Sequence, residues 1–358
     1  MDNVKKARIG YIDIAKGIGM LTVIYGHILY ATNIYTYIYS FHMPLFFFLA
    51  GMCYRKAKYA SFPQIVKARA KTLLLPYFIF SVSTWAVWAL YNLVFQNEVE
   101  SYFSPLLQTF IAQGSGGYLV HNVPLWFIPC LFIVELLYYF IAKLPKRYIL
   151  LICVVLATVG HFMSKGVLGL SFSALPLSFD VAMTGIAFYA AGNLFTDPFG
   201  KKIPHQLAKR EKPFCWGLSL LLCVLVFLIA PLNDVISMSG NLLGTSTLFF
   251  YLIAFLGIAS ILLLSISFEN SPFVQLKKGL IYIGRYSFYF MAVHVPIKGF
   301  LIVLLSKLFP TLSEAFSTEY LPSALVFVLT LIVSSFTVIA INFILRFYKG
   351  KTERKALS

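Results

Sequence analysis

Apolar runs long enough to cross a bilayer recur along almost the entire chain. A spanning helix needs about 20 mostly apolar residues. Ten runs approach that length: 10–31, 38–54, 73–95, 124–142, 148–163, 174–195, 214–231, 245–266, 281–305 and 322–346. Only 12% of the residues are charged, about half the share of a typical soluble domain. We therefore expect an all-α, polytopic membrane protein of about ten transmembrane helices, forming a single membrane domain over residues 1–358.

Lysines and arginines alternate between the connections, and their placement predicts the orientation. They gather before the first run, after the last run, and in 55–72, 143–147 and 201–212. Three of the intervening connections hold none: 31–38, 96–123 and 232–244. Basic connections are retained in the cytoplasm, so both termini are predicted to face it and the protein to lie in the cell membrane. Topology also accounts for most of the net charge of +16, and we expect no nucleic-acid partner.

Neither a metal site nor a cleavable leader is predicted. The five cysteines lie within or beside apolar runs and lack the paired spacing of zinc sites, so they are expected to pack in the core. The first apolar run contains Asp13 and Lys16 and lacks a small-residue cleavage site, so we expect no signal peptide. Because the chain ends soon after the last run, no further transferase domain is expected.

Ionisable residues in the first run indicate a functional site, because such groups are costly inside a bilayer. Lys16 and His27 are eleven residues apart, which places them on one helix face and roughly 16 Å apart along the axis. Asp13 lies three residues before Lys16, where it can pair with it. Lys16 is equally consistent with snorkelling to the headgroups, and Asp13 with an acidic helix start. For His27 function is favoured, since no local partner is evident.

The other polar residues divide between the two halves of the predicted bilayer. Toward the outer half lie His27, His42, Trp126 and Asp180, with His294 in the ninth run. Toward the cytoplasmic half lie Lys16, Arg69, Lys71 and Arg285. A basic inner vestibule suits a phosphate-bearing donor, and a histidine near carboxylates suits general-base activation of a hydroxyl. Trp126 by itself is typical of an interfacial anchor.

Several of these residues occur in short motifs that follow one another in order. The motifs are Tyr11–Gly17 with Gly26-His27, Ser40–Gly51, Arg69 before Leu73–Tyr77, Leu125–Phe127, Leu175-Pro176 with Ser178 and Asp180, and Ile283-Gly284 through His294. The ordered set covers nearly the whole chain. It resembles the acyltransferase 3 family of bacterial integral-membrane O-acyltransferases, in particular the fucose 4-O-acetylase-like branch.

The resemblance implies a ten-helix core, an acyl-CoA donor (usually acetyl-CoA) entering from the cytoplasm, and a carbohydrate hydroxyl as acceptor. The family's motif of a basic residue, ten residues and a histidine maps onto Lys16 and His27. It implies that His27 is the base or an acyl relay and that Lys16 contacts the donor. Two positions depart from the family: Lys16 stands where arginine is usual, and Arg69 is followed by Thr72 instead of a second arginine.

The working hypothesis is therefore a membrane O-acetyltransferase that modifies a cell-surface or lipid-linked glycan. Lys16, Arg69 and Lys71 would hold the CoA phosphates, and Asp13 would orient Lys16. The acceptor side would be lined by His42, Trp126, Asp180 and His294. Three alternatives stay open: a flippase for lipid-linked sugars without acyl transfer, succinyl instead of acetyl transfer, and assembly into a homo-oligomer. The partners implied are membrane lipid, an acyl-CoA and the saccharide acceptor.

Overall fold

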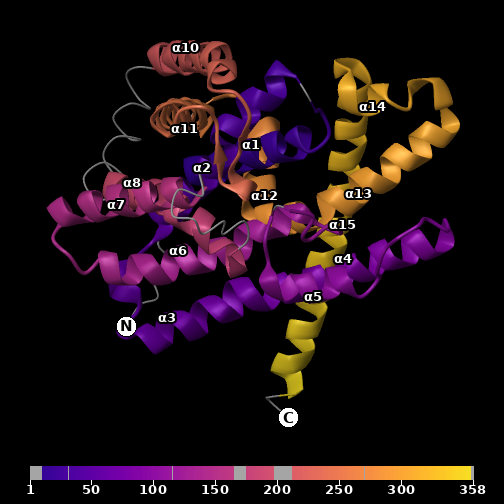
Figure 1. Ribbon diagram of the computed structural model, residues 1–358, viewed down its shortest axis with the longest axis horizontal. Coiled ribbons are helices and arrows are strands. Elements are labelled where there is room, and N and C mark those ends of the chain that lie inside the picture. Colours follow the sequence, from indigo (N-terminus) through magenta and orange to yellow (C-terminus); the bar gives the residue numbers. More distant parts are fainter. Residues whose placement is uncertain are drawn as a thin grey trace.

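The computed structural model describes residues 10–30, 32–114, 116–164, 175–196, 212–269 and 271–355, and these are mostly helical (Figure 1). The first helices are α1 (Gly10–Gly26), α2 (Asn33–Cys53), α3 (Phe62–Arg69), α4 (Leu75–Val94), α5 (Ser104–Ile111), α6 (Phe127–Ile141), α7 (Lys146–Ser164) and α8 (Phe179–Thr196). The later ones are α10 (Lys212–Ile229), α11 (Thr247–Glu269), α12 (Val274–Arg285), α13 (Ser287–Leu308), α14 (Ala315–Thr318) and α15 (Tyr320–Lys355). The predicted helical class is confirmed.

Short turns of helix and one small hairpin join these elements. The 3-10 turns are η1 (Lys56–Lys58), η3 (Val123–Trp126), η4 (Pro176–Ser178), η5 (Ala230–Asn233), η6 (Met238–Gly240) and η7 (Pro310–Leu312). A π-helical turn, η2 (Ala70–Leu74), joins α3 to α4. Strands β1 (Ile236–Ser237) and β2 (Leu242–Leu243) pair antiparallel, with Ile236 opposite Leu243. In Figure 1 the carboxyl-terminal end of α15 projects well beyond the other helices.

Eight helical segments of the described chain are long and apolar enough to cross a bilayer, so the protein is a multi-pass membrane protein. They are Asn33–Cys53, Phe62–Val94, Val123–Ile141, Lys146–Met163, Pro213–Asn233, Thr247–Glu269, Ser287–Leu308 and Tyr320–Phe347. The expected spans at 10–31 and 174–195 are helical as α1 and α8 but are not among the eight. Both are short and contain buried carboxylates, Asp13 and Asp180. Ten spans and two cytoplasmic termini stay predictions.

Two helical segments differ in extent from the predicted runs. The run at 73–95 begins earlier, because α3, η2 and α4 form a continuous helical segment from Phe62. The basic residues that ended the apolar run do not end the helix, since lysine and arginine are good helix formers. The run at 281–305 is interrupted at Tyr286, whose φ of −108° and ψ of 18° separate α12 from α13. The break turns the polar helix α12 away from the apolar α13 that follows it.

Helix α1 lies in the core, packed against α2, α11, α12 and α13. Its contact with α12 is made through backbone atoms: a Cβ added at Gly17 would lie 2.2 Å from the carbonyl oxygen of Leu280. A Cβ added at Gly284 would lie 1.8 Å from the carbonyl oxygen of Asp13. Only glycine permits this approach, which is a common means of packing helices in membranes. The contact sets the position of the α1 face that bears Lys16.

Candidate active site

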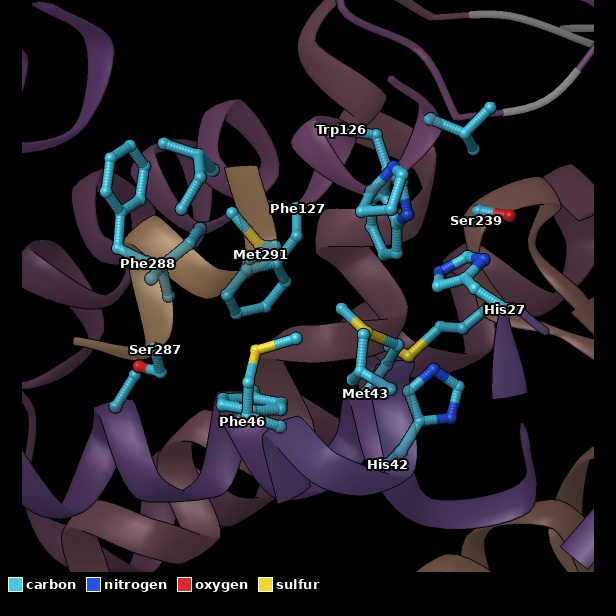
Figure 2. Close-up of a pocket in the computed structure, with 18 of the residues that line it drawn as sticks. His27, His42, Met43, Phe46, Trp126, Phe127, Ser239, Ser287, Phe288 and Met291 are labelled. Carbon is cyan, nitrogen blue, oxygen red and sulfur yellow. The ribbon is translucent and has the colours of Figure 1, made fainter. Parts of the chain in front are cut away.

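A cavity of about 400 Å³ lies between α1, α2, α6, α13 and the β1–β2 hairpin. Lys16 and His27 both line it, which is the arrangement that their spacing on one helix face predicts. His42 from α2 and Trp126 from η3 complete the set of predicted site residues in its wall. Figure 2 shows His27, His42 and Trp126 gathered at one end, with Ser287 and Phe288 toward the other. We call the first the His27 end. The second is the Lys16 end, because Gly17, next to Lys16, packs against Gly284, three residues before Ser287.

The tautomers of two histidines follow from their hydrogen bonds. His42 Nδ1 lies 2.8 Å from the carbonyl oxygen of Ile38, and His294 Nδ1 lies 3.0 Å from that of Phe290. A carbonyl only accepts, so in each ring Nδ1 donates and the Nε2 of the neutral imidazole is left as an acceptor. Since His42 is part of the cavity wall, its Nε2 is an acceptor nitrogen in that wall.

His27 lies between the cavity and His294. The ring centroids of His27 and His294 are 5.4 Å apart. His294 is fully buried, and its Nε2 has no hydrogen-bond partner within the described chain. An unpartnered buried acceptor is costly, and the nearby ring of His27 is the group positioned to supply a donor. A hydrogen bond from His27 to His294 Nε2 would hold one ring nitrogen of His27 toward His294 and leave the other for the cavity.

Lys298 holds the backbone at the end of α1. Its Nζ donates to the carbonyl oxygen of His27 at 3.0 Å and to the hydroxyl of Tyr30 at 3.3 Å. The Tyr30 hydroxyl donates to the same His27 carbonyl at 2.9 Å. A cation at the carboxyl end of a helix satisfies free carbonyls and complements the helix dipole. Lys298 was not singled out in the sequence; its position four residues after His294 was the available signal.

The segment before η3 ties the tryptophan to α13. Asn122 Nδ2 donates to the carbonyl oxygen of Ala292 at 2.7 Å. The adjacent His121 is buried outside the predicted spans, and burial lowers the pKa of its imidazole to about 4, so it is neutral at physiological pH. Trp126 follows on η3 and is 3% exposed, so it packs as part of the wall and not as an exposed interfacial anchor.

Two ion pairs lie behind the cavity wall. Asp13 binds Arg285, with 3.3 Å between Oδ2 and Nε, and Arg69 binds Glu135. Glu135 lies in the middle of the apolar run 124–142, and its partner Arg69 is 66 residues earlier in the chain. The predicted pairing of Asp13 with Lys16 stays a prediction, and the structure places Arg285 at the carboxylate. Of the described residues that line the cavity, Lys16 is the only lysine or arginine.

The remaining predicted residues lie outside the cavity wall. Asp13, Arg69, Lys71, Asp180 and His294 do not line it, although His294 contacts His27. Lys71 is exposed on the π-helical turn η2. Asp180 is buried, and its Oδ1 has no hydrogen-bond partner within the described chain. Their roles in donor or acceptor binding stay predictions.

The structure adds residues that the sequence did not single out. Apart from its ends, the wall is mainly aromatic and apolar, as in most small-molecule sites. Tyr35 and Tyr39 stack at 4.0 Å between centroids, and Tyr39 lies 4.8 Å from His42. The hairpin contributes Ser237, Met238 and Ser239. No sequence signal identified these three residues, which belong to a short connection between two apolar runs.

Comparison with known proteins decides the class of this site. The sequence model of the acyltransferase 3 family, described as an acyltransferase domain, matches residues 9–345. The chain belongs to the acyltransferase 3 family. No curated protein and no solved structure matches it significantly. The acyltransferase domain therefore spans all the elements that build the cavity, and the narrower fucose 4-O-acetylase-like assignment stays a prediction.

Proposed function

We propose that this acyltransferase transfers an acetyl group from acetyl-CoA to a hydroxyl of a cell-surface or lipid-linked glycan. The observation that carries the proposal is that Lys16 and His27, on one face of α1, line one cavity in a member of an acyltransferase family. Lys16 binds a CoA phosphate at one end, and the thioester reaches toward His27 at the other. Both termini face the cytoplasm, the donor enters from that side, and the acceptor enters from the outer side.

The proposed chemistry uses His27 as a general base. One ring nitrogen donates to His294, and the other accepts the proton of the acceptor hydroxyl as its oxygen attacks the thioester carbonyl. The carbon–sulfur bond breaks, and the CoA thiolate takes the proton from the His27 imidazolium. In the covalent variant, a ring nitrogen of His27 attacks the thioester carbonyl carbon and the CoA thiolate leaves. The acceptor oxygen then attacks the acetyl carbon, the bond to the imidazole breaks, and the hydroxyl proton passes to the thiolate. His42 and Trp126 line the acceptor side in both versions, and Asp180 lies outside the cavity wall.

The ion pairs determine which basic residues besides Lys16 can bind the phosphates of the donor. Arg69 is already neutralised by Glu135, so it contributes less to phosphate binding than its position in the sequence implied. Lys71 is exposed and free to meet a phosphate outside the cavity. Asp13 holds Arg285 and the start of α13 near Lys16. Membrane lipid, acetyl-CoA and a saccharide are the proposed partners, and neither a metal ion nor a nucleic acid takes part.

The test uses the purified protein in nanodiscs with radiolabelled acetyl-CoA and a panel of p-nitrophenyl glycosides. We expect CoA release and acetyl ester on a glycoside, and a loss of about 10²- to 10⁴-fold in His27→Ala, the range for removal of a general base. His161→Ala is the matched control, because that ring is hydrogen-bonded to Thr247 and lies outside the cavity wall. Acetyl transfer that persists in His27→Ala contradicts the assignment of His27 as the base or acyl relay. Lipid-linked sugar movement without CoA release points to a flippase, and succinyl-CoA as a better donor corrects the acyl group.

A further inference from the structure

The β1–β2 hairpin is an exception to the helical architecture, and it reaches the catalytic end of the cavity. Its strands, Ile236–Ser237 and Leu242–Leu243, form the sole sheet of the described chain. Ser237 at the end of β1 and Met238 and Ser239 in the turn η6 lie in the cavity wall. We propose that this hairpin forms the acceptor subsite, and that Ser237 and Ser239 select a saccharide ring by hydrogen-bonding a hydroxyl next to the one acetylated. The inference rests on the proposed function.

The base of the hairpin is closed by one asparagine. Asn233 Nδ2 donates to the carbonyl oxygen of Leu243 at 3.0 Å, and its Oδ1 accepts from the backbone N–H of Ser246 at 2.9 Å. Its own carbonyl accepts from the N–H of Thr245, also at 2.9 Å. Asn233 is fully buried. All these bonds fix where the two strands leave α10 and enter α11.

The turn of the hairpin is attached to two further helices. Asn241 takes the left-handed conformation, with φ of 53°, that asparagine tolerates better than most residues. Its Nδ2 donates to the carbonyl oxygen of Gly160 in α7 at 3.0 Å, and its Oδ1 accepts from Thr184 Oγ1 in α8 at 2.8 Å. Because the hairpin is held at base and turn, its serines are positioned in advance of binding, which lowers the entropic cost of recognition.

The serines lie beside the tryptophan. A Cβ added at Gly114 would lie 2.5 Å from the Trp126 ring and 2.9 Å from the Cβ of Ser239, so these three residues meet at one point. Figure 2 shows Ser239 at the same end of the cavity as His27 and Trp126. An aromatic ring and a hydroxyl side by side match a sugar, which presents C–H groups and hydroxyls on one ring.

The serine pair has hydrogen-bonding capacity left for a ligand. Ser237 Oγ and Ser239 Oγ are 3.2 Å apart, so one donates to the other. A hydroxyl has one donor and two acceptor sites, which leaves a donor on the accepting serine. A site that pairs with a ligand hydroxyl discriminates strongly against an acceptor without it, because its polar groups are then unpaired. A simple alcohol, which has no second hydroxyl to pair with the serines, is therefore expected to bind here more weakly than a sugar.

The experiment compares two acceptors in nanodiscs with saturating acetyl-CoA: the best p-nitrophenyl glycoside of the panel and 1-octanol, which has no neighbouring hydroxyl. In the double variant Ser237→Ala/Ser239→Ala, kcat/KM for the glycoside relative to octanol is expected to fall about tenfold, as for one or two lost hydrogen bonds. The KM for acetyl-CoA is expected to stay within about twofold. Ser239→Thr, which keeps a hydroxyl, is expected to retain most of the preference.

Val235→Ala is the control on the same connection, because that side chain is 60% exposed and lies outside the cavity wall. It is expected to keep the glycoside preference. A preference that is unchanged in the double variant, or a loss that is equal for glycoside and octanol, overturns the subsite while leaving the proposed transfer intact. If the unaltered protein acetylates no hydroxyl, the proposed function and the subsite both fail.

Discussion

The two ends of the cavity differ in the charge of the side chains that line them. Around the Lys16 end, the carboxylates of Asp13 and Glu135 are each bound to an arginine behind the wall, and the lysine is left facing the space. At the His27 end, imidazole rings hydrogen-bond backbone carbonyls through Nδ1 in His42 and His294. One end thus presents the ammonium of Lys16 to the cavity, and the other presents the imidazole rings of His27 and His42.

The difference separates binding from chemistry. A fixed cation in a low-dielectric wall attracts phosphate strongly and takes no proton in return. A neutral imidazole does the reverse: it binds anions weakly but accepts a proton from a hydroxyl. Pairing the other charges behind the wall keeps the cavity itself mostly apolar. Three variants probe this division, beginning with the largest expected effect.

Arg69→Ala tests whether the hidden ion pairs serve stability. It leaves the carboxylate of Glu135, whose side chain is 5% exposed, buried without its cation, and breaking a buried pair costs about 3–5 kcal/mol. We expect a marked fall in the thermal unfolding midpoint in detergent. The double variant Arg69→Met/Glu135→Gln is expected to recover much of the loss, because no lone charge remains. An unchanged midpoint together with a raised KM for acetyl-CoA contradicts this division and restores Arg69 as a donor contact.

His294→Phe tests the neutral end. It keeps a buried ring but removes the Nε2 acceptor near His27, so the proposed hydrogen bond that orients His27 cannot form. We expect kcat to fall about 100-fold, near the lower limit for general-base effects, with little change in the KM for acetyl-CoA. His294→Gln, which offers an amide oxygen, is expected to restore part of kcat. Equal activity in the His294→Phe and His294→Gln variants means that the His294 ring only fills space.

The sequence predicts what depends on local periodicity. The apolar runs locate most of the helices, and an eleven-residue spacing suffices to place Lys16 and His27 in one wall. The ends of helices are less predictable, because η2 continues through basic residues that close an apolar run, and Tyr286 breaks a run that reads as continuous. Hydropathy measures the surroundings of a segment and says little about its backbone angles.

Partners that are distant in the chain could not be predicted. Asp13 lies three residues from Lys16, which makes that pairing the natural prediction, yet it binds Arg285, 272 residues away, because α1 and α12 meet at glycines. The connection 232–244 is short and free of basic residues, so its sequence indicates only an outer loop. Its place in the cavity depends on Asn241 reaching α7 and α8, and such contacts exist only after the helices have packed.

Lys16→Ala tests the charged end and is expected to have the smallest effect of the three. One charge-assisted hydrogen bond contributes about 1.5–3 kcal/mol, and at the lower limit of that range kcat/KM for acetyl-CoA is expected to fall about tenfold. Acetyl-pantetheine carries the same thioester without phosphates, so its turnover is expected to change little. Lys16→Arg keeps the charge and is expected to retain most activity, and Lys278→Ala, an exposed lysine on α12, is the control. If kcat/KM falls equally for acetyl-CoA and acetyl-pantetheine, Lys16 acts on the reacting thioester or on folding. The separation of binding from chemistry along the cavity is then wrong.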